Sequence, residues 1–163
     1  MGFSNKTVIV TGAGKGIGKG IALLYAEKGA NVVIADIDEN AGAETAGLIK
    51  DRGGKAVFVR TDVRREADIV HLMEVAHQTY GRIDILINNA GKGLFKSPYD
   101  LSVEEWDDLL NTNLRSVFLA AREAAKYMRN NKDGGSIVNI ASTRALMSEP
   151  DSEAYAASKG GIV

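Results

Sequence analysis

Residues 11–18 read TGAGKGIG, and this stretch decides how the rest of the chain is interpreted. It follows an apolar run at 7–11 (TVIVT) typical of a buried strand and leads into a helix-like stretch at 16–28. Glycines let the backbone turn tightly and let an anion approach, and the following helix offers free N–H groups. This order predicts a site for the pyrophosphate of a dinucleotide. The residues expected to form it are Gly12, Gly14, Lys15, Gly16, Ile17 and Gly18.

Strand-like and helix-like segments alternate along the whole chain. Further strands are predicted at 31–36, 55–60, 83–88 and 135–140. Further helices are predicted at 39–52, 65–80, 103–130 (in two pieces) and from about 152 onward. This alternation favours a parallel sheet with helices on both faces, because parallel strands need crossover connections. We therefore predict an α/β fold, a Rossmann-like doubly wound sheet with strand order 3-2-1-4-5.

The composition is that of an ordinary globular domain. The 163 residues are 45% hydrophobic and 25% charged, with a net charge of −1, so nothing favours nucleic acid or an anionic membrane as a partner. The chain has no cysteine, which excludes disulfides and thiolate catalysis within it. No apolar run approaches the roughly 20 residues of a membrane span, and residues 1–6 lack the apolar core of a signal peptide. We expect a cytoplasmic protein.

Asp36 ends the second predicted strand, eighteen residues after Gly18. A carboxylate at this place can accept hydrogen bonds from the adenosine ribose and would repel a 2′-phosphate. With Ile37 beside it, Asp36 therefore favours NAD. Lys15 points the other way, because its charge could pair with the 2′-phosphate of NADP. An ordinary helix N-terminal or loop carboxylate is the alternative for Asp36.

Tyr155 and Lys159 are four residues apart on the last predicted helix and therefore share one face. An ammonium group near a phenol lowers the phenol's pKa, which makes tyrosine a usable acid or base. Ser142 lies thirteen residues earlier, just after the fifth strand, where its hydroxyl could bind a carbonyl or alkoxide oxygen. The alternatives are an exposed helical pair and a loop serine. His71 and His77 lie on the third helix, and we expect both to be solvated, with no metal site.

Four further motifs follow in order: DV at 62–63, NNAG at 88–91, NTNL at 111–114 and YAASK at 155–159. Together with TGAGKGIG and Ser142, they resemble the short-chain dehydrogenase/reductase family across the whole chain. Each motif is weak alone, but six in order are specific. The resemblance implies a single NAD(P)-binding Rossmann domain over 1–163. It also implies an enzyme that exchanges a hydride between nicotinamide and a secondary alcohol or ketone.

The resemblance also implies a role for each matching residue. Asn113 would hold a kink and a water, Ser142 would orient the substrate oxygen, Tyr155 would move the proton, and Lys159 would bind the nicotinamide ribose and tune Tyr155. Asp62 and Val63 would contact the adenine. The residues implied to line the cofactor and support the central strands are Asn88, Asn89, Ala90 and Gly91.

Members of the family usually continue with two more strands, so this chain is expected to be a fragment or the ordered part of a longer protein. Strands 6 and 7 would be missing, strand 135–140 would be an open edge, and the last helix would have little to hold it. Turnover of the fragment is expected to be weak or absent, and dimers or tetramers would form in the longer protein. A non-catalytic dinucleotide-binding or scaffolding protein stays open as an alternative, as does a nucleotide-binding methyltransferase.

Overall fold

Five short apolar segments of the chain form one parallel sheet. The computed structural model describes residues 2–163 and places the strands in the order β3-β2-β1-β4-β5, all with parallel neighbours. This confirms the predicted α/β, Rossmann-like doubly wound fold and its order 3-2-1-4-5. The strands are β1 (Thr7–Thr11), β2 (Asn31–Asp36), β3 (Lys55–Arg60), β4 (Ile85–Asn88) and β5 (Ser136–Asn139).

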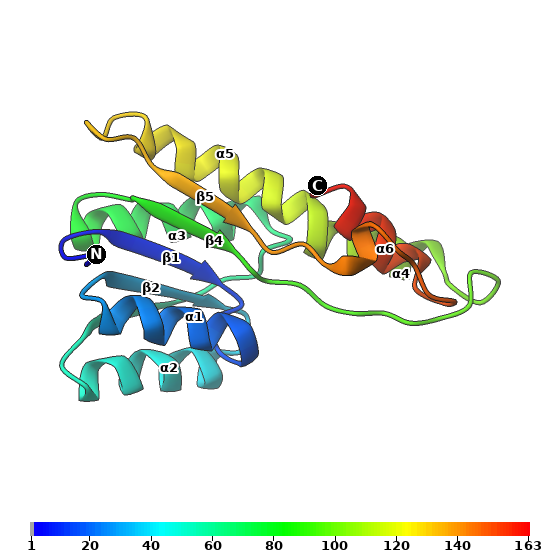
Figure 1. Ribbon diagram of the computed structural model, residues 1–163, viewed down its shortest axis with the longest axis horizontal. Helices are drawn as coiled ribbons and strands as arrows, with labels where there is room; N and C mark the ends of the chain where they lie inside the picture. The colour runs from blue at the N-terminus through cyan, green and yellow to red at the C-terminus, as the bar shows by residue number, and fades with distance from the viewer. Residues whose placement is uncertain (1) are drawn as a thin grey trace.

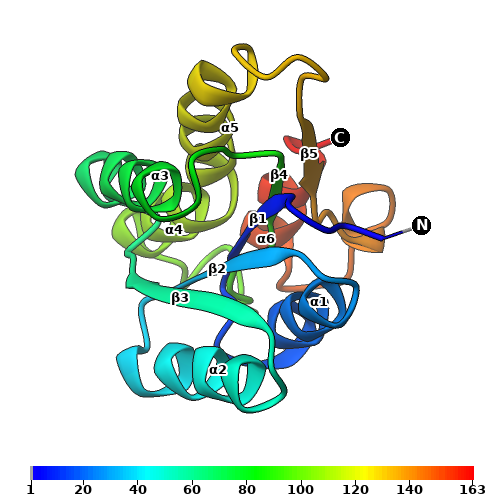
Figure 2. The same ribbon diagram turned by 90° about the vertical axis from the view of Figure 1, so that its left-hand side faces the viewer.

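Helices cover both faces of the sheet, as Figure 2 shows. One face carries α1 (Gly16–Glu27) and α2 (Glu39–Asp51), and the other carries α3 (Glu66–Tyr80) and α5 (Ser116–Met128). Successive strand residues point to opposite faces, so each strand contributes to two cores. Val8 and Val10 pack with Ala22 and Ile49 on the first face, whereas Ile9 packs with the α3 and α5 side chains on the second. The near-continuous apolar strands thus match a sheet covered on both sides.

The buried face of α1 differs from the one that the apolar spacing predicts. Ile17, Ile21, Leu24 and Tyr25 share a side of the predicted helix, but Ile17 and Leu24 are 68% and 55% exposed. Gly18 and Ala22 are the buried residues of α1. Ile21 and Tyr25 do pack against the core as partly buried residues, so the prediction is wrong only for Ile17 and Leu24.

The long helical stretch after β4 is continuous but contains a π-helical turn. It consists of α4 (Val103–Leu110), the turn η1 (Asn111–Arg115) and α5. Ser102 caps α4 in a capping box, because its side chain accepts from Glu105 N and the Glu105 side chain accepts from Ser102 N. The predicted division into two pieces is confirmed, and the join is the π-turn, a feature often found at functional sites.

The last helix, α6 (Glu153–Gly160), is held more firmly than expected. It lies against α4 and η1, beyond the carboxyl ends of β4 and β5 (Figure 1). Ala154 and Ser158 are buried, and the Ser158 hydroxyl accepts a hydrogen bond of 3.1 Å from Asn113 Nδ2. The expectation that little would hold this helix is therefore wrong.

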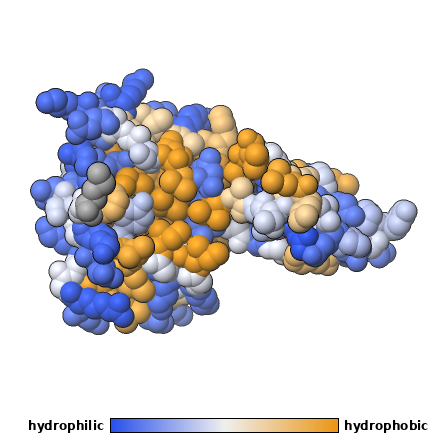
Figure 3. All heavy atoms as spheres, in the orientation of Figure 1, coloured by the Kyte–Doolittle hydropathy of each residue, from blue (hydrophilic) through white to orange (hydrophobic). Residues whose placement is uncertain are grey.

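β5 is an exposed edge strand in the described residues. All four of its residues are exposed, including Ile137 and Val138, which point to opposite faces of the sheet. Figure 3 shows apolar residues gathered over β4, β5 and the adjoining part of α1. The predicted open edge is confirmed. Within residues 2–163, no helix combines the length and the apolar character that crossing a membrane requires.

Candidate active site

The glycine turn is held against the start of the β4 loop. Gly12 has φ of +63°, a left-handed conformation that favours glycine. Asn89 Nδ2 donates to the carbonyl oxygens of Thr11 and Gly12, at 2.9 and 3.1 Å. A Cβ on Gly18 would lie only 2.2 Å from Gly12 O, so the turn and α1 touch backbone to backbone. The turn therefore leaves space in front of the α1 N-terminus, as an anion site requires.

Asp36 supports this turn from β2. Its Oδ2 accepts from Gly14 N at 2.7 Å, and its Oδ1 accepts from Asp38 N at 2.9 Å. A Cβ on Gly14 would lie 2.9 Å from the same Oδ2, so only glycine permits the contact. The cap of α2 is Asp38, whose side chain accepts from Ala41 N. Asp38, and not Asp36, therefore caps α2, while the Asp36 carboxylate holds the backbone of the glycine turn and of the loop after β2.

The Lys15 side chain in the glycine turn forms an ion pair with Asp38. Its Nζ lies 2.7 Å from Asp38 Oδ2, in an ion pair exposed to solvent. The hydrogen bond to Asp38 raises the pKa of Lys15, and the same bond lowers the pKa of Asp38. The sequence did not reveal this pair, because its members come from different loops that the β1–β2 pairing brings together.

Several linked ion pairs lie beside Asp62 and Val63 in the loop after β3. The Asp62 carboxylate accepts from Arg64 Nε and NH2, at 2.8 and 2.6 Å, and these bonds hold the pKa of Asp62 below its ordinary value. Arg64 NH1 also donates to Asp108 Oδ1 at 2.7 Å, and Lys92 pairs with the other oxygen of Asp108. These ion pairs connect the loop after β3 to the loop after β4. Arg64 joins the two loops through its contacts with Asp62 and Asp108.

Asn113, in the π-helical turn, forms hydrogen bonds with the backbone of the loop after β4. Its Oδ1 accepts from Lys92 N and its Nδ2 donates to Lys92 O, both at 2.9 Å. Nδ2 also donates to Ser158 Oγ, so Asn113 links η1, this loop and α6. The side chain is completely buried. It therefore lies behind the wall of the site rather than in it.

Tyr155 and Lys159 stand on one face of α6, as predicted. Lys159 Nζ lies 5.8 Å from the centre of the Tyr155 ring and donates to Ile140 O at 2.7 Å. Burial lowers the pKa of Lys159, because the charged form loses hydration. The Phe95 ring packs against Tyr155 from the loop after β4, with ring centres 6.1 Å apart. Ser142 Oγ accepts from Arg144 N at 3.2 Å.

One hollow of about 1020 Å³ brings nearly all of the predicted residues together at the carboxyl ends of the strands. Gly14, Gly18, Asn88 and Asn113 are not among its lining residues. Residues that line it without having been predicted include Asp38 and Arg64, whereas Phe95 lies in a loop that the sequence offered as substrate lining. The predicted residues that line it are Gly12, Lys15, Gly16, Ile17, Asp36, Ile37, Asp62, Val63, Asn89, Ala90, Gly91, Ser142, Tyr155 and Lys159.

Thr11 is the other residue that the sequence interpretation missed. Its Oγ1 accepts from Asn89 N and Ala90 N, at 3.1 and 3.0 Å, and ties the end of β1 to the loop after β4. The signal was present, since Thr11 opens the TGAGKGIG motif, but its hydroxyl bonds across the sheet and not to an expected ligand.

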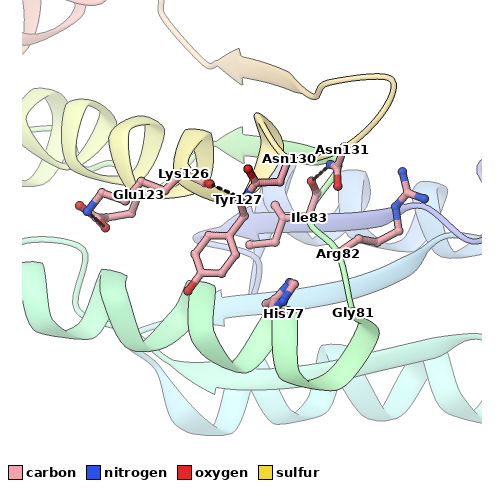
Figure 4. Close-up of a pocket in the computed structure, with 9 residues that line it drawn as sticks. All are labelled: His77, Gly81, Arg82, Ile83, Glu123, Lys126, Tyr127, Asn130 and Asn131. Carbon is pink, nitrogen blue, oxygen red and sulfur yellow. Dashed lines mark hydrogen bonds and ion pairs between the residues drawn. The ribbon is translucent and has the colours of Figure 1, made fainter.

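A second, smaller hollow of about 560 Å³ lies at the opposite end of the sheet. Figure 4 shows Tyr127 of α5 directed toward His77 of α3, with ring centres 5.1 Å apart. Arg82 at its rim is engaged by Asp84, and Lys126 by Glu123. His71 and His77 are both exposed, as expected. In the part of the chain that the structure describes, no three acidic or histidine side chains gather as a metal site would need.

Comparison with known proteins extends this picture. The family model described as short chain dehydrogenase matches residues 6–163. An "uncharacterized oxidoreductase" of Thermotoga maritima is 45% identical over 161 residues, which are 99% of this chain and 62% of that protein. Glucose 1-dehydrogenase 2 of Bacillus subtilis is 38% identical over 98% of this chain and 63% of its own length.

The fold comparison agrees. A crystal structure from Sinorhizobium meliloti 1021, assigned provisionally as a short-chain alcohol dehydrogenase, matches with a TM-score of 0.94 and 35% identity. The match covers 99% of this chain and 64% of that one. The chain thus spans less than two thirds of the length of these relatives. On the sequence match and on the fold, the chain belongs to the short-chain dehydrogenase family.

Proposed function

We propose that the protein is an NAD(P)-dependent oxidoreductase that interconverts a secondary alcohol and a ketone. The observation that carries this proposal is the meeting of Ser142, Tyr155 and Lys159 with the glycine turn in one hollow. The glycine turn and these three side chains line the same hollow within residues 2–163, which supports the proposal. A methyltransferase would have no use for the Tyr155 and Lys159 pair.

The residues present fit a dinucleotide. The backbone at Gly12 and Gly18 is so close to its neighbours that a Cβ would collide, and the open side of the turn faces the hollow. We propose that this turn holds the pyrophosphate, that Asp36 and Ile37 bind the adenosine ribose, and that Asp62 and Val63 contact the adenine. Asn89, Ala90 and Gly91 would line the rest of the cofactor. The nicotinamide supplies the hydride chemistry.

The chain's own residues would handle the proton and the substrate oxygen. The Tyr155 hydroxyl would exchange a proton with that oxygen, and Ser142 Oγ would donate a hydrogen bond to it. Lys159 is buried beside the Tyr155 ring and fixed by Ile140 O. Its position beside the Tyr155 ring would let it act on Tyr155 and bind the nicotinamide ribose. Asn113 would hold this arrangement through Lys92 and Ser158.

Substrate, assembly and compartment are further proposals. Leu146 and Met147 are exposed in the loop after Ser142, and Phe95 is exposed in the loop after β4, so we propose that part of the substrate surface is apolar. The name of the Bacillus subtilis relative makes glucose a first substrate to test. We propose a cytoplasmic homodimer or homotetramer built on α5 and α6. Phe118 on α5 supports this, because it is 61% exposed and has Arg122 over its ring.

The Tyr155→Phe variant tests the proposed reaction. We expect it to bind NADH with unchanged fluorescence enhancement and to lose at least about 100-fold in turnover, because the proton donor is absent. Tyr99→Phe is the matched control, since Tyr99 is 96% exposed, and we expect it to behave as the wild type. The assay is a screen of secondary alcohols, including glucose, with NAD and NADP. Turnover in the Tyr155→Phe variant equal to that of the wild type would contradict the proposal. NADH binding without any turnover would favour the non-catalytic alternative only in a chain that has the full length of the relatives.

A further inference from the structure

Three charged side chains lie together at the end of the hollow where β2 meets the glycine turn. Asp36 and Asp38 come from β2 and the start of α2, and Lys15 comes from the turn. All three line the hollow. Lys15 Nζ and Asp38 Oδ2 are 2.7 Å apart, and their side chains are 78% and 41% exposed. The pair therefore faces the solvent in which a nucleotide would arrive.

The Asp38 carboxylate is fixed by its surroundings. Its Oδ1 accepts from Ala41 N at 3.1 Å as the cap of α2, which leaves Oδ2 directed at Lys15. Its backbone N–H is held in turn by Asp36 Oδ1 at 2.9 Å. Asp36 thus positions Asp38, and Asp38 positions Lys15. The ion pair is a consequence of how α2 begins and not a chance surface contact.

The charges at this place do not favour a second phosphate. Lys15 carries the one positive charge of the three, and Asp38 compensates it at contact distance. The next lysine, Lys19, is paired with Glu44 at 2.8 Å. With Asp36 added, the group of three has a net charge of −1. A 2′-phosphate, which carries close to two negative charges, would have to displace Asp38 from Lys15 to gain a cation.

We propose that Asp38 makes this chain select a nucleotide without a 2′-phosphate, because it holds Lys15 in an ion pair. The inference rests on the proposed dinucleotide function and deepens it. Asp36 keeps its place at the ribose, and Asp38 is a second determinant of specificity that acts through Lys15. Lys15, which by itself would favour NADP, has its charge compensated by the ion pair with Asp38.

The Asp38→Asn variant separates the charge from the fold. Asparagine caps helices as well as aspartate does, so the bond to Ala41 N persists while the charge disappears. The probes are 5′-AMP and 2′,5′-ADP, which differ by the 2′-phosphate alone, and their affinities are measured by isothermal titration calorimetry. We expect the affinity ratio to shift toward 2′,5′-ADP by about tenfold, which corresponds to about 1.4 kcal/mol. The shift should shrink as salt is added, because both partners are exposed.

Three further variants make the test specific. Glu44→Gln removes the same charge from the neighbouring Lys19 pair and should leave the ratio within about twofold of the wild type, because that pair does not line the hollow. Lys15→Gln alone should also change the ratio little, because Lys15 is already engaged. Lys15→Gln combined with Asp38→Asn should cancel the gain. Thermal unfolding confirms that each variant is folded.

The outcomes are distinguishable. An unchanged ratio in Asp38→Asn, with 5′-AMP still bound, would overturn this inference and leave the proposed function standing. A loss of about tenfold in 2′,5′-ADP affinity in Lys15→Gln alone would also overturn it, since Lys15 would then already serve the 2′-phosphate. Failure of the wild type to bind either nucleotide would overturn the proposed function and the inference together.

Discussion

Asp84 shows how a single buried charge organises the end of the sheet opposite the active site. It is 4% exposed, and it accepts from Lys6 Nζ, Thr7 N and Arg82 Nε at 3.1, 2.9 and 2.8 Å. Burial alone would raise the pKa of Asp84, but these hydrogen bonds outweigh it and hold the pKa below its ordinary value. The ionised form is therefore the one that stabilises the fold.

We predict that Asp84→Asn lowers the free energy of unfolding by about 2–4 kcal/mol at neutral pH, because Lys6 and Arg82 lose their common partner. The stabilisation by Asp84 is fully present above the unfolded-state pKa near 3.8 and is lost as pH falls through the lower folded-state pKa. Urea denaturation at neutral pH and at about pH 3 measures the difference. Asp133→Asn, whose side chain is 74% exposed, is the control. A difference between wild type and Asp84→Asn that stays constant down to the lower pH would contradict the prediction.

Gly18 and Gly20 stand on the same helix but have opposite surroundings. A Cβ on Gly18 would meet Gly12 O at 2.2 Å and Asn89 Nδ2 at 2.5 Å, whereas a Cβ on Gly20 would meet nothing within 4 Å. We predict that Gly18→Ala costs about 2–4 kcal/mol of stability and abolishes binding of 5′-AMP. Gly20→Ala should instead stabilise the protein by about 0.5–1 kcal/mol, because alanine favours the helix. Thermal unfolding and calorimetry measure both, and equal effects of the two substitutions would be inconsistent with this account.

At the residue scale, the sequence predicted the identity of most site residues but not their partners. Gly12, Tyr155 and Ser142 belong to motifs whose chemistry is local and therefore readable. The contact between Lys15 and Asp38 depends on how closely α2 begins beside the turn, which no local pattern encodes. Long-range polar contacts of this kind cannot be predicted from local sequence patterns.

At the scale of elements, the strands were predicted almost residue by residue, since a doubly covered strand is apolar throughout. The helix faces were predicted less well. For α1, spacing selected Ile17 and Leu24, whereas the close approach of Gly18 and Ala22 to the sheet decides which side is buried. Spacing predicted only a break at the π-turn Asn111–Arg115. The family resemblance implied a kink held by Asn113, whose side chain contacts the distant loop at Lys92.

Asn113 provides this contact, and its removal should make the loop at Lys92 more mobile. We predict that Asn113→Ala lowers the free energy of unfolding by about 2–4 kcal/mol, because Lys92 N–H, Lys92 C=O and the Ser158 hydroxyl lose a buried partner. Hydrogen exchange at the Lys92 amide should accelerate more than that at the core of β1. Asn130→Ala, at an exposed site, should change stability by less than about 0.5 kcal/mol. If the Lys92 amide in the variant stayed as protected from hydrogen exchange as in the wild type, the proposed role of Asn113 would be contradicted.

At the scale of the whole molecule, the two cores are unequal at the β5 edge. The face covered by α3 and α5 is closed along most of the sheet, whereas the face that carries α1 leaves β4 and β5 visible as an apolar area (Figure 3). Val138 is aligned with Ile87 of this core and is 43% exposed, whereas Ile137 points to the opposite face and is 38% exposed. The free backbone edge of β5 adds unpaired N–H and C=O groups, and an exposed apolar edge strand is a template for pairing with another chain.

We predict that this 163-residue chain associates through the β5 edge when it is concentrated, and that Val138→Lys weakens the association by at least about tenfold in Kd. A charge on an edge strand resists pairing, because a second strand would bury it. Sedimentation velocity over a range of concentrations measures the effect. Val103→Lys is the matched control, since Val103 is 70% exposed but lies on α4, away from the sheet edge. If both substitutions weaken association equally, charge alone is responsible and β5 is not the contact. If neither does, association uses another surface, for which the exposed Phe118 on α5 is the next residue to change.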